Sequence, residues 1–121
     1  MILRNVMAAK LHGIRVTHTR LFYSGSIALP RAIIEAAGFI ENDQVAVYNF
    51  NSGARYETYV IYGKDDEVSA NGPSARLSAP GDRLAIVQYV LTDEILKPRL
   101  LFFNEFNRQV AKQEVFPGEE P

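Results

Sequence analysis

Cysteine is absent from this chain of 121 residues. Its absence excludes disulfide bonds, thiolate nucleophiles and cysteine-ligated metal sites, and it is typical of intracellular proteins. The N-terminal segment also lacks a long apolar core, since it leads directly into Lys10, His12 and Arg15. We therefore expect neither a signal peptide nor a membrane span, and we expect a cytoplasmic location.

Several common catalytic motifs are missing as well. The chain has no glycine-rich phosphate-binding loop, no H-E-x-x-H helix and no G-x-S-x-G nucleophile elbow, and His12 and His18 are its only histidines. No metal site is therefore expected. The 13 basic and 14 acidic side chains give a net charge of -1, which argues against nucleic acid or an anionic membrane as the main partner.

The chain instead carries many short apolar segments separated by turn residues. Polarity alternates within residues 6–17 from Lys10 onward, which predicts a strand with Lys10 and His12 on the same side. Pro30 in a first turn and Gly38 just past an end predict one short helix over 29–38. Further strands are expected at 44–50, 56–62, 68–70, 84–91, 99–104 and 109–116, and one helical turn at 93–97. We therefore predict a single domain over residues 1–121, a small and mainly β barrel with one or two short helices.

A bend at Gly25-Ser26 is the first candidate for chemistry. After a polar connection over 17–20, the apolar runs 21–23 and 27–29 predict strands on either side of it. Glycine lets its carbonyl be approached closely and tolerates unusual dihedral angles, and the Ser26 hydroxyl lies next to that carbonyl. An acyl shift from nitrogen to this hydroxyl, followed by elimination and hydrolysis, would leave a pyruvoyl group. Because Gly-Ser is also a common turn dipeptide, the motif gains weight only from its context.

A second set of candidates lies on the strand expected at 56–62 and at its start. Arg55 offers a planar fork suited to a carboxylate, and Tyr59 offers a phenol that can donate a proton from an apolar site. Taken singly, these residues are more typical of a surface arginine and an ordinary strand aromatic. Lys10 and His12 likewise face either solvent or a common site.

Taken together, these residues resemble the pyruvoyl-dependent aspartate 1-decarboxylase family. The similarity runs nearly from end to end, in matching order and spacing. It is carried by Lys10-Leu11-His12, Val16-Thr17-His18, Tyr23-Ser24-Gly25-Ser26, Ala36-Ala37-Gly38, Glu41-Asn42, Asn49, Gly53, Arg55, Thr58-Tyr59, Asn71-Gly72, Gly81-Asp82 and Pro98. The resemblance implies a double-ψ β-barrel, a homotetramer with active sites between subunits, and self-cleavage into chains 1–25 and 26–121.

The resemblance also implies the reaction and its cofactor. In this family the amine of L-aspartate forms a Schiff base with a pyruvoyl carbonyl, which accepts the electrons released as carbon dioxide leaves. The product is β-alanine, which is used in pantothenate and coenzyme A synthesis. The pyruvoyl group would here derive from Ser26, and no metal is implied.

Each matching residue inherits an expected role from the resemblance. Arg55 and Lys10 bind a substrate carboxylate, and Tyr59 returns a proton to the carbanion as a general acid. Thr58 donates to the Gly25 carbonyl oxygen during cleavage. The remaining expected pocket residues are Asn71 and Gly72 for substrate contact, and His12 and Tyr23 for orienting the other groups.

Three positions depart from the family pattern. Ser24 stands where many relatives carry glutamate, Tyr48 replaces a tryptophan, and Pro73 removes a backbone donor beside Asn71-Gly72. Because of Pro73, an alternative is that this protein has the barrel fold of the family but neither cleaves itself nor catalyses decarboxylation. Whether cleavage needs a maturation factor is also left open.

A different functional class shares part of the pattern. Residues 27–49, with Leu-Pro-Arg, a short helix and an Asn-Asp turn into a strand, also resemble the swapped-hairpin barrels of AbrB-like DNA-binding regulators. Those proteins would be expected to carry a basic stripe, whereas this chain is nearly neutral. They would not require Gly25-Ser26, Arg55 and Thr58-Tyr59 together.

Overall fold

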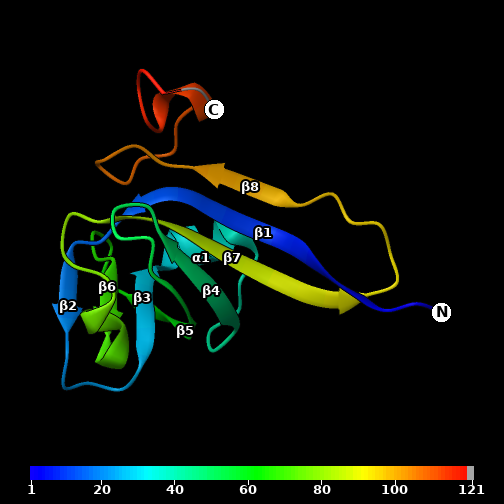
Figure 1. Cartoon of the computed structure of the whole chain (residues 1–121), viewed down its shortest axis with the longest axis horizontal. Coiled ribbons are helices and arrows are strands. Elements are labelled where there is room, and N and C mark those ends of the chain that lie inside the picture. Colours follow the sequence, from blue (N-terminus) through cyan, green and yellow to red (C-terminus); the bar gives the residue numbers. More distant parts are fainter. Residues whose placement is uncertain (120–121) are drawn as a thin grey trace.

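The computed structural model describes residues 1–119 (Figure 1). Its elements are β1 (Arg4–Arg15), β2 (His18–Arg20), β3 (Ser26–Pro30), α1 (Arg31–Ala37), β4 (Gln44–Asn49), β5 (Arg55–Gly63), β6 (Ser69–Asn71), the 3-10 helix η1 (Gly72–Arg76), β7 (Arg83–Thr92), β8 (Arg99–Phe102) and the 3-10 helix η2 (Lys112–Glu114). The prediction of a mainly β, barrel-like fold with one or two short helices is confirmed. Among residues 1–119, no helix has both the length and the apolar character needed to cross a membrane.

The eight strands form one mixed sheet in the order β2-β6-β3-β5-β4-β7-β1-β8. The pairs β1/β8, β2/β6 and β3/β5 are parallel, and the others are antiparallel. In Figure 1, β1 and β7 run side by side as a long ribbon, with β8 along one edge and the short strands β2, β3 and β6 grouped at one end. Because β3 lies between β6 and β5, residues of both strands adjoin the bend that precedes β3.

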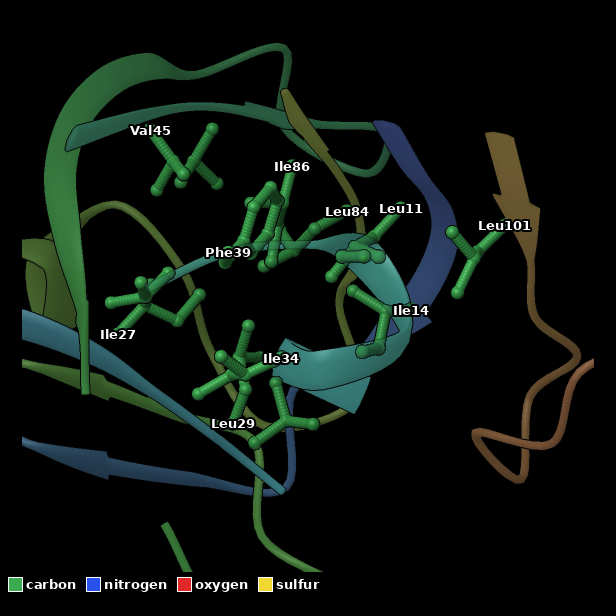
Figure 2. Close-up of a cluster of buried hydrophobic side chains, with 14 of the residues drawn as sticks. Leu11, Ile14, Ile27, Leu29, Ile34, Phe39, Val45, Leu84, Ile86 and Leu101 are labelled. Carbon is green, nitrogen blue, oxygen red and sulfur yellow. The ribbon is translucent and has the colours of Figure 1, made fainter. Parts of the chain in front are cut away.

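The helix α1 forms where proline and glycine predict it. Pro30 is its N-cap, and Gly38 ends it in the left-handed region with a φ of 77° while its backbone N–H bonds to the Glu35 carbonyl. Ile34 and Ala37, three residues apart, form its buried face. Figure 2 shows Ile34 pointing from the helix into the core.

The core is made by alternate residues of the long strands. Leu11, Val45 and Ile86 are each at most 1 % exposed. Figure 2 shows these side chains directed toward one another around Phe39. Each large aliphatic side chain buried in this way contributes about 1.5–3 kcal/mol. The intervening residues of β1 and β4, such as Lys10, His12 and Tyr48, point away from the core and are half-buried, whereas β7 is buried on both faces from Leu84 to Val87.

Two predictions around the first bend are wrong. Residues 21–23 form a bend rather than a strand, and Phe22 is 98 % exposed. The polar residues His18–Arg20 form β2 instead, because they pair in parallel with β6. A strand as short as β2 forms because its backbone hydrogen-bonds to β6. The apolar pattern of its own residues therefore could not predict it.

Two predictions near the C-terminus are also wrong. Residues 93–97 form no helical turn, and residues 109–116 contribute an isolated bridge from Gln109 to Phe103 and then η2 rather than a strand. The Arg83 guanidinium donates to the carbonyls of Phe103 and Val115, each at 3.0 Å. This side chain satisfies backbone groups that strand pairing would otherwise use.

Candidate active site

Ser26 begins β3 directly opposite Asn71, the last residue of β6. Both are 1 % exposed. The Asn71 Nδ2 donates to Ser26 Oγ at 2.9 Å, and Ser26 Oγ lies 3.4 Å from the Ser24 carbonyl oxygen. A buried amide therefore holds the Ser26 hydroxyl beside the Gly25-Ser26 peptide bond.

Gly72 packs its backbone against the same bend. Its φ is 65°, and a Cβ there would lie 2.8 Å from Gly25 Cα and 2.9 Å from the Tyr23 carbonyl oxygen. Gly25 itself does not have a positive φ, and a Cβ on it would meet only Pro73 Cδ, at 3.8 Å. The expectation that Gly25 supplies an unusual backbone conformation is therefore wrong, because the steric requirement lies at Gly72.

The residues of β5 with expected roles lie on opposite faces of the strand. Tyr56 packs on the core, and Thr58 shares that side by alternation. Arg55 and Tyr59 point to the opposite face. Among residues 1–119, no hydrogen bond joins the Thr58 hydroxyl to Gly25.

Tyr59 lies at the level of Ser26 on the neighbouring strand. Ile27 of β3 pairs with Val60 of β5 in parallel register, and both side chains are fully buried. Ser26 and Tyr59 each precede this pair by one residue, so their side chains emerge on the other side of the two strands. Their positions bring the expected nucleophile and the expected proton donor to the same end of β3 and β5.

Arg55 belongs to a row of residues that crosses the outer face of the sheet. Arg55 pairs with Tyr48, Tyr48 with Ala85, and Ala85 with His12. The Arg55 Cζ lies 4.0 Å from the centre of the Tyr48 ring, a cation–π contact, and the Tyr48 and Tyr89 hydroxyl oxygens are 3.0 Å apart. Within the described residues Arg55 has no carboxylate partner, so its N–H donors are available to a substrate.

His12 is surrounded by aromatic rings. The ring centres of Phe50, Phe102 and Phe116 lie 5.2, 5.8 and 5.9 Å from that of His12, all edge-on. Its Nδ1 is buried without a hydrogen-bond partner in the described chain. Burial lowers the pKa of His12 below 6.5, and the positive charges of Lys10, Lys112 and Arg83 lower it further, so the neutral imidazole is favoured.

The predicted site residues thus form two groups in one chain. The first contains Tyr23, Gly25, Ser26, Tyr59, Asn71 and Gly72, with Thr58 on the adjoining core side of β5. The second contains Lys10, His12 and Arg55, on the outer face. Ser26 precedes Ile27 and so lies level with Tyr59, which is four residues, or about 13 Å along an extended strand, beyond Arg55. Within one chain the backbone of Arg55 is therefore well separated from that of Ser26.

Sequence reasoning missed two polar contributors. Ser69 donates to Asn71 Oδ1 at 2.7 Å, and Arg20 Nη1 donates to Ser69 Oγ at 2.8 Å. Alternation along β6 places Ser69 and Asn71 on one side, so Ser69 was detectable from the sequence. Arg20 was not, because its contact depends on the unpredicted β2/β6 pairing.

Known proteins match this chain over most of its length. A model of the aspartate decarboxylase family matches residues 2–110. The chain is 42 % identical over 109 residues to aspartate 1-decarboxylase of Clostridium botulinum, covering 85 % of this chain and 88 % of that protein. It is 38 % identical over 120 residues to aspartate 1-decarboxylase of Psychromonas ingrahamii, covering 94 % and 95 %. The family match includes residues 27–49 and favours the decarboxylase interpretation of that segment over the DNA-binding one. The chain belongs to the aspartate decarboxylase family, a family of carboxy-lyases.

Proposed function

We propose that this protein decarboxylates L-aspartate to β-alanine and carbon dioxide after cleaving itself between Gly25 and Ser26. Membership of the family supports the substrate and the reaction. The observation that carries the cleavage step is the buried Ser26 hydroxyl, held by Asn71 at 2.9 Å beside the peptide bond to be broken. The 1–121 domain would yield chains 1–25 and 26–121.

The atoms exchanged in self-cleavage all come from this chain and water. Ser26 Oγ attacks the Gly25 carbonyl carbon, the C–N bond breaks, and the hydroxyl proton passes to the nitrogen of residue 26, which gives an ester. Loss of the Cα proton of residue 26 then breaks the Cβ–Oγ bond and releases Gly25 as a carboxylate. Water replaces the nitrogen of residue 26, which leaves as ammonia, and a ketone remains at the new N-terminus.

The residues around Ser26 fit a pyruvoyl group, since Ser26 supplies its carbon atoms and Asn71 offers an amide donor at that position. When present, this group supplies an electrophilic carbonyl that accepts an electron pair. Arg55 binds a carboxylate of aspartate through donors that no other side chain of the described residues occupies. Lys10 adds positive charge on the same face, and Tyr59 holds the proton that replaces the lost carboxylate.

The separation of Arg55 from Ser26 supports an active site shared between subunits. Since about 13 Å of strand lies between Arg55 and Tyr59, the residue level with Ser26, a second copy of the chain would supply the Arg55 of each site. A homotetramer in the cytoplasm, producing β-alanine for pantothenate and coenzyme A synthesis, is consistent with the family.

The intact mass of the denatured protein tests this function. We expect two chains divided after residue 25, the larger one blocked to Edman sequencing and reactive with a carbonyl reagent, together with release of carbon dioxide from aspartate. Ser26→Ala should give one uncut chain without activity. A Ser26→Ala protein that still decarboxylates aspartate would overturn the mechanism.

A further inference from the structure

A chain of hydrogen-bonded side chains leads from the surface to Ser26. Glu67 forms an ion pair with Arg20, and Arg20 Nη1 donates to Ser69 Oγ at 2.8 Å. Ser69 Oγ donates to Asn71 Oδ1 at 2.7 Å, and Asn71 Nδ2 donates to Ser26 Oγ at 2.9 Å. Three successive hydrogen bonds therefore link Ser26, the proposed nucleophile, to Arg20 on β2.

The arginine sets the direction of every bond in this chain. A guanidinium has only donors, so Ser69 Oγ must accept from Arg20 and its own proton remains for Asn71 Oδ1. The Asn71 amide is then oriented with its nitrogen toward Ser26. Without the Arg20 donor, the Ser69 hydroxyl would be free to rotate and the amide free to turn its oxygen toward Ser26.

Burial makes this orientation matter. Ser69 is fully buried, Asn71 and Ser26 are 1 % exposed, and only Arg20, with a side chain 39 % exposed, reaches solvent. The strands β2, β6 and β3 are adjacent, with Arg20 opposite Asn71 and Asn71 opposite Ser26. Because these atoms are buried away from bulk solvent, a misdirected amide oxygen would lack an exposed partner to compensate for it.

We propose that Arg20 and Ser69 are positioning residues for self-cleavage, acting on Ser26 through Asn71. This inference rests on the proposed cleavage between Gly25 and Ser26. Because the Asn71 N–H donates to Ser26 Oγ, the Ser26 hydroxyl proton points away from Asn71. It can donate to the Ser24 carbonyl oxygen, which lies 3.4 Å from Ser26 Oγ. When the Cβ–Oγ bond later breaks, Oγ leaves as part of the Gly25 carboxylate, and the same N–H stabilises its negative charge.

The test compares three variants of the whole chain. The double variant Arg20→Met/Glu67→Gln removes the donor without leaving the buried carboxylate unpaired. Arg20→Lys keeps a side chain that has only donors. The matched control, Arg31→Met/Glu35→Gln, removes the other ion pair of residues 1–119, which lies on α1 and is exposed. Self-cleavage is followed by intact mass, and folding by thermal unfolding.

We expect Arg20→Met/Glu67→Gln to cleave about five-fold more slowly than the unaltered chain, the change in rate that corresponds to about 1 kcal/mol. Arg20→Lys and the control should cleave at the unaltered rate. A double variant that cleaves as fast as the control, or an Arg20→Lys protein as slow as the double variant, overturns the inference. If Arg20→Met/Glu67→Gln fails to fold, Ser69→Ala replaces it, with the same expected slowing and the same overturning result.

The same measurements separate this inference from the proposed function. An unaltered chain that stays uncut and releases no carbon dioxide from aspartate contradicts the function and the inference with it. An unaltered chain that cleaves and decarboxylates, beside a double variant that cleaves equally fast, contradicts the positioning role alone.

Discussion

Gly72 contributes to the site through its backbone alone. Its φ of 65° belongs to the left-handed region, and the space that a Cβ would need is occupied by Gly25 Cα and the Tyr23 carbonyl oxygen. The turn after β6 thus packs directly on the bend that contains the proposed cleavage site. Any side chain at residue 72 would move that bend relative to Ser26 and Asn71.

We predict that Gly72→Ala slows self-cleavage on the order of 100-fold, because a displacement of about 1 Å removes the geometry needed for attack. The left-handed φ alone should lower the free energy of unfolding by about 1–2 kcal/mol. Gly53→Ala is the matched control, since Gly53 has a φ of 78° with nothing within 4 Å of the added Cβ. It should lose similar stability and cleave normally. Equal cleavage rates in the two variants would contradict a steric role for Gly72.

At the scale of elements, side-chain alternation predicted the strands that bury one face, and it missed those defined only by their partners. The strands β1 and β4 carry such a pattern, whereas a long apolar run indicated β7 and a turn before its second arm indicated β5. The short strand β2 carries no alternating pattern. It is held in place by its pairing with β6 and by the Arg20–Glu67 ion pair, and neither contact is visible in the local sequence. The same limit explains why Lys10 and His12 were correctly placed on one face while Arg20 was overlooked.

The Arg20–Glu67 pair predicts a pH-dependent stability of the β2/β6 pairing. Arg20 lowers the pKa of Glu67 below its ordinary value of 4.5. A carboxyl whose pKa is lower in the folded chain than in the unfolded chain stabilises the fold above pH 4.5, and this stabilisation is lost as the pH falls through the lowered pKa. We expect Glu67→Gln to lower the free energy of unfolding by about 1 kcal/mol at pH 7. In acid the free energies of unfolding of Glu67→Gln and the unaltered chain should be equal.

Urea unfolding at pH 7 and at several values below pH 4.5 measures this difference. Glu35→Gln is the control, because the side chains of the Arg31–Glu35 pair are 66 % and 62 % exposed and such pairs contribute little. A difference between Glu67→Gln and the unaltered chain that stays constant with pH would contradict the stabilising role of the ion pair.

At the scale of the whole molecule, the proposed site lies in two places. Strand alternation predicted that Lys10 and His12 share a face, and the structure adds that Arg55 lies in the same row as His12 across the sheet. The pairing of β3 with β5 and β6 gathers the other group around Ser26. No local pattern gives the distance between the two groups, since it depends on the register of five strands, β1, β7, β4, β5 and β3. That separation is what supports the proposal that a second subunit completes the site.

Mixed assemblies test this division directly. Arg55→Ala should leave self-cleavage intact and weaken aspartate binding, and Ser26→Ala should leave Arg55 intact and remain uncut. When the two variants are unfolded together and refolded, some boundaries join an intact Arg55 from the Ser26→Ala chain to a processed residue 26 from the Arg55→Ala chain. At low aspartate concentration we therefore expect the mixture to exceed the summed activity of the separate variants.

The control mixture combines Arg55→Ala with Lys10→Ala, two changes in the same group. Each chain in that mixture lacks either Arg55 or Lys10, so no interface between two chains contains a complete site. The activity of the mixture should therefore equal the average of the two variants. Recovery in the first mixture only would place residue 26 and Arg55 of one active site on different chains. Failure of both mixtures to recover, in assemblies that mass spectrometry shows to be mixed, would mean that Arg55 of one chain acts on its own residue 26, against the separation of about 13 Å along β5.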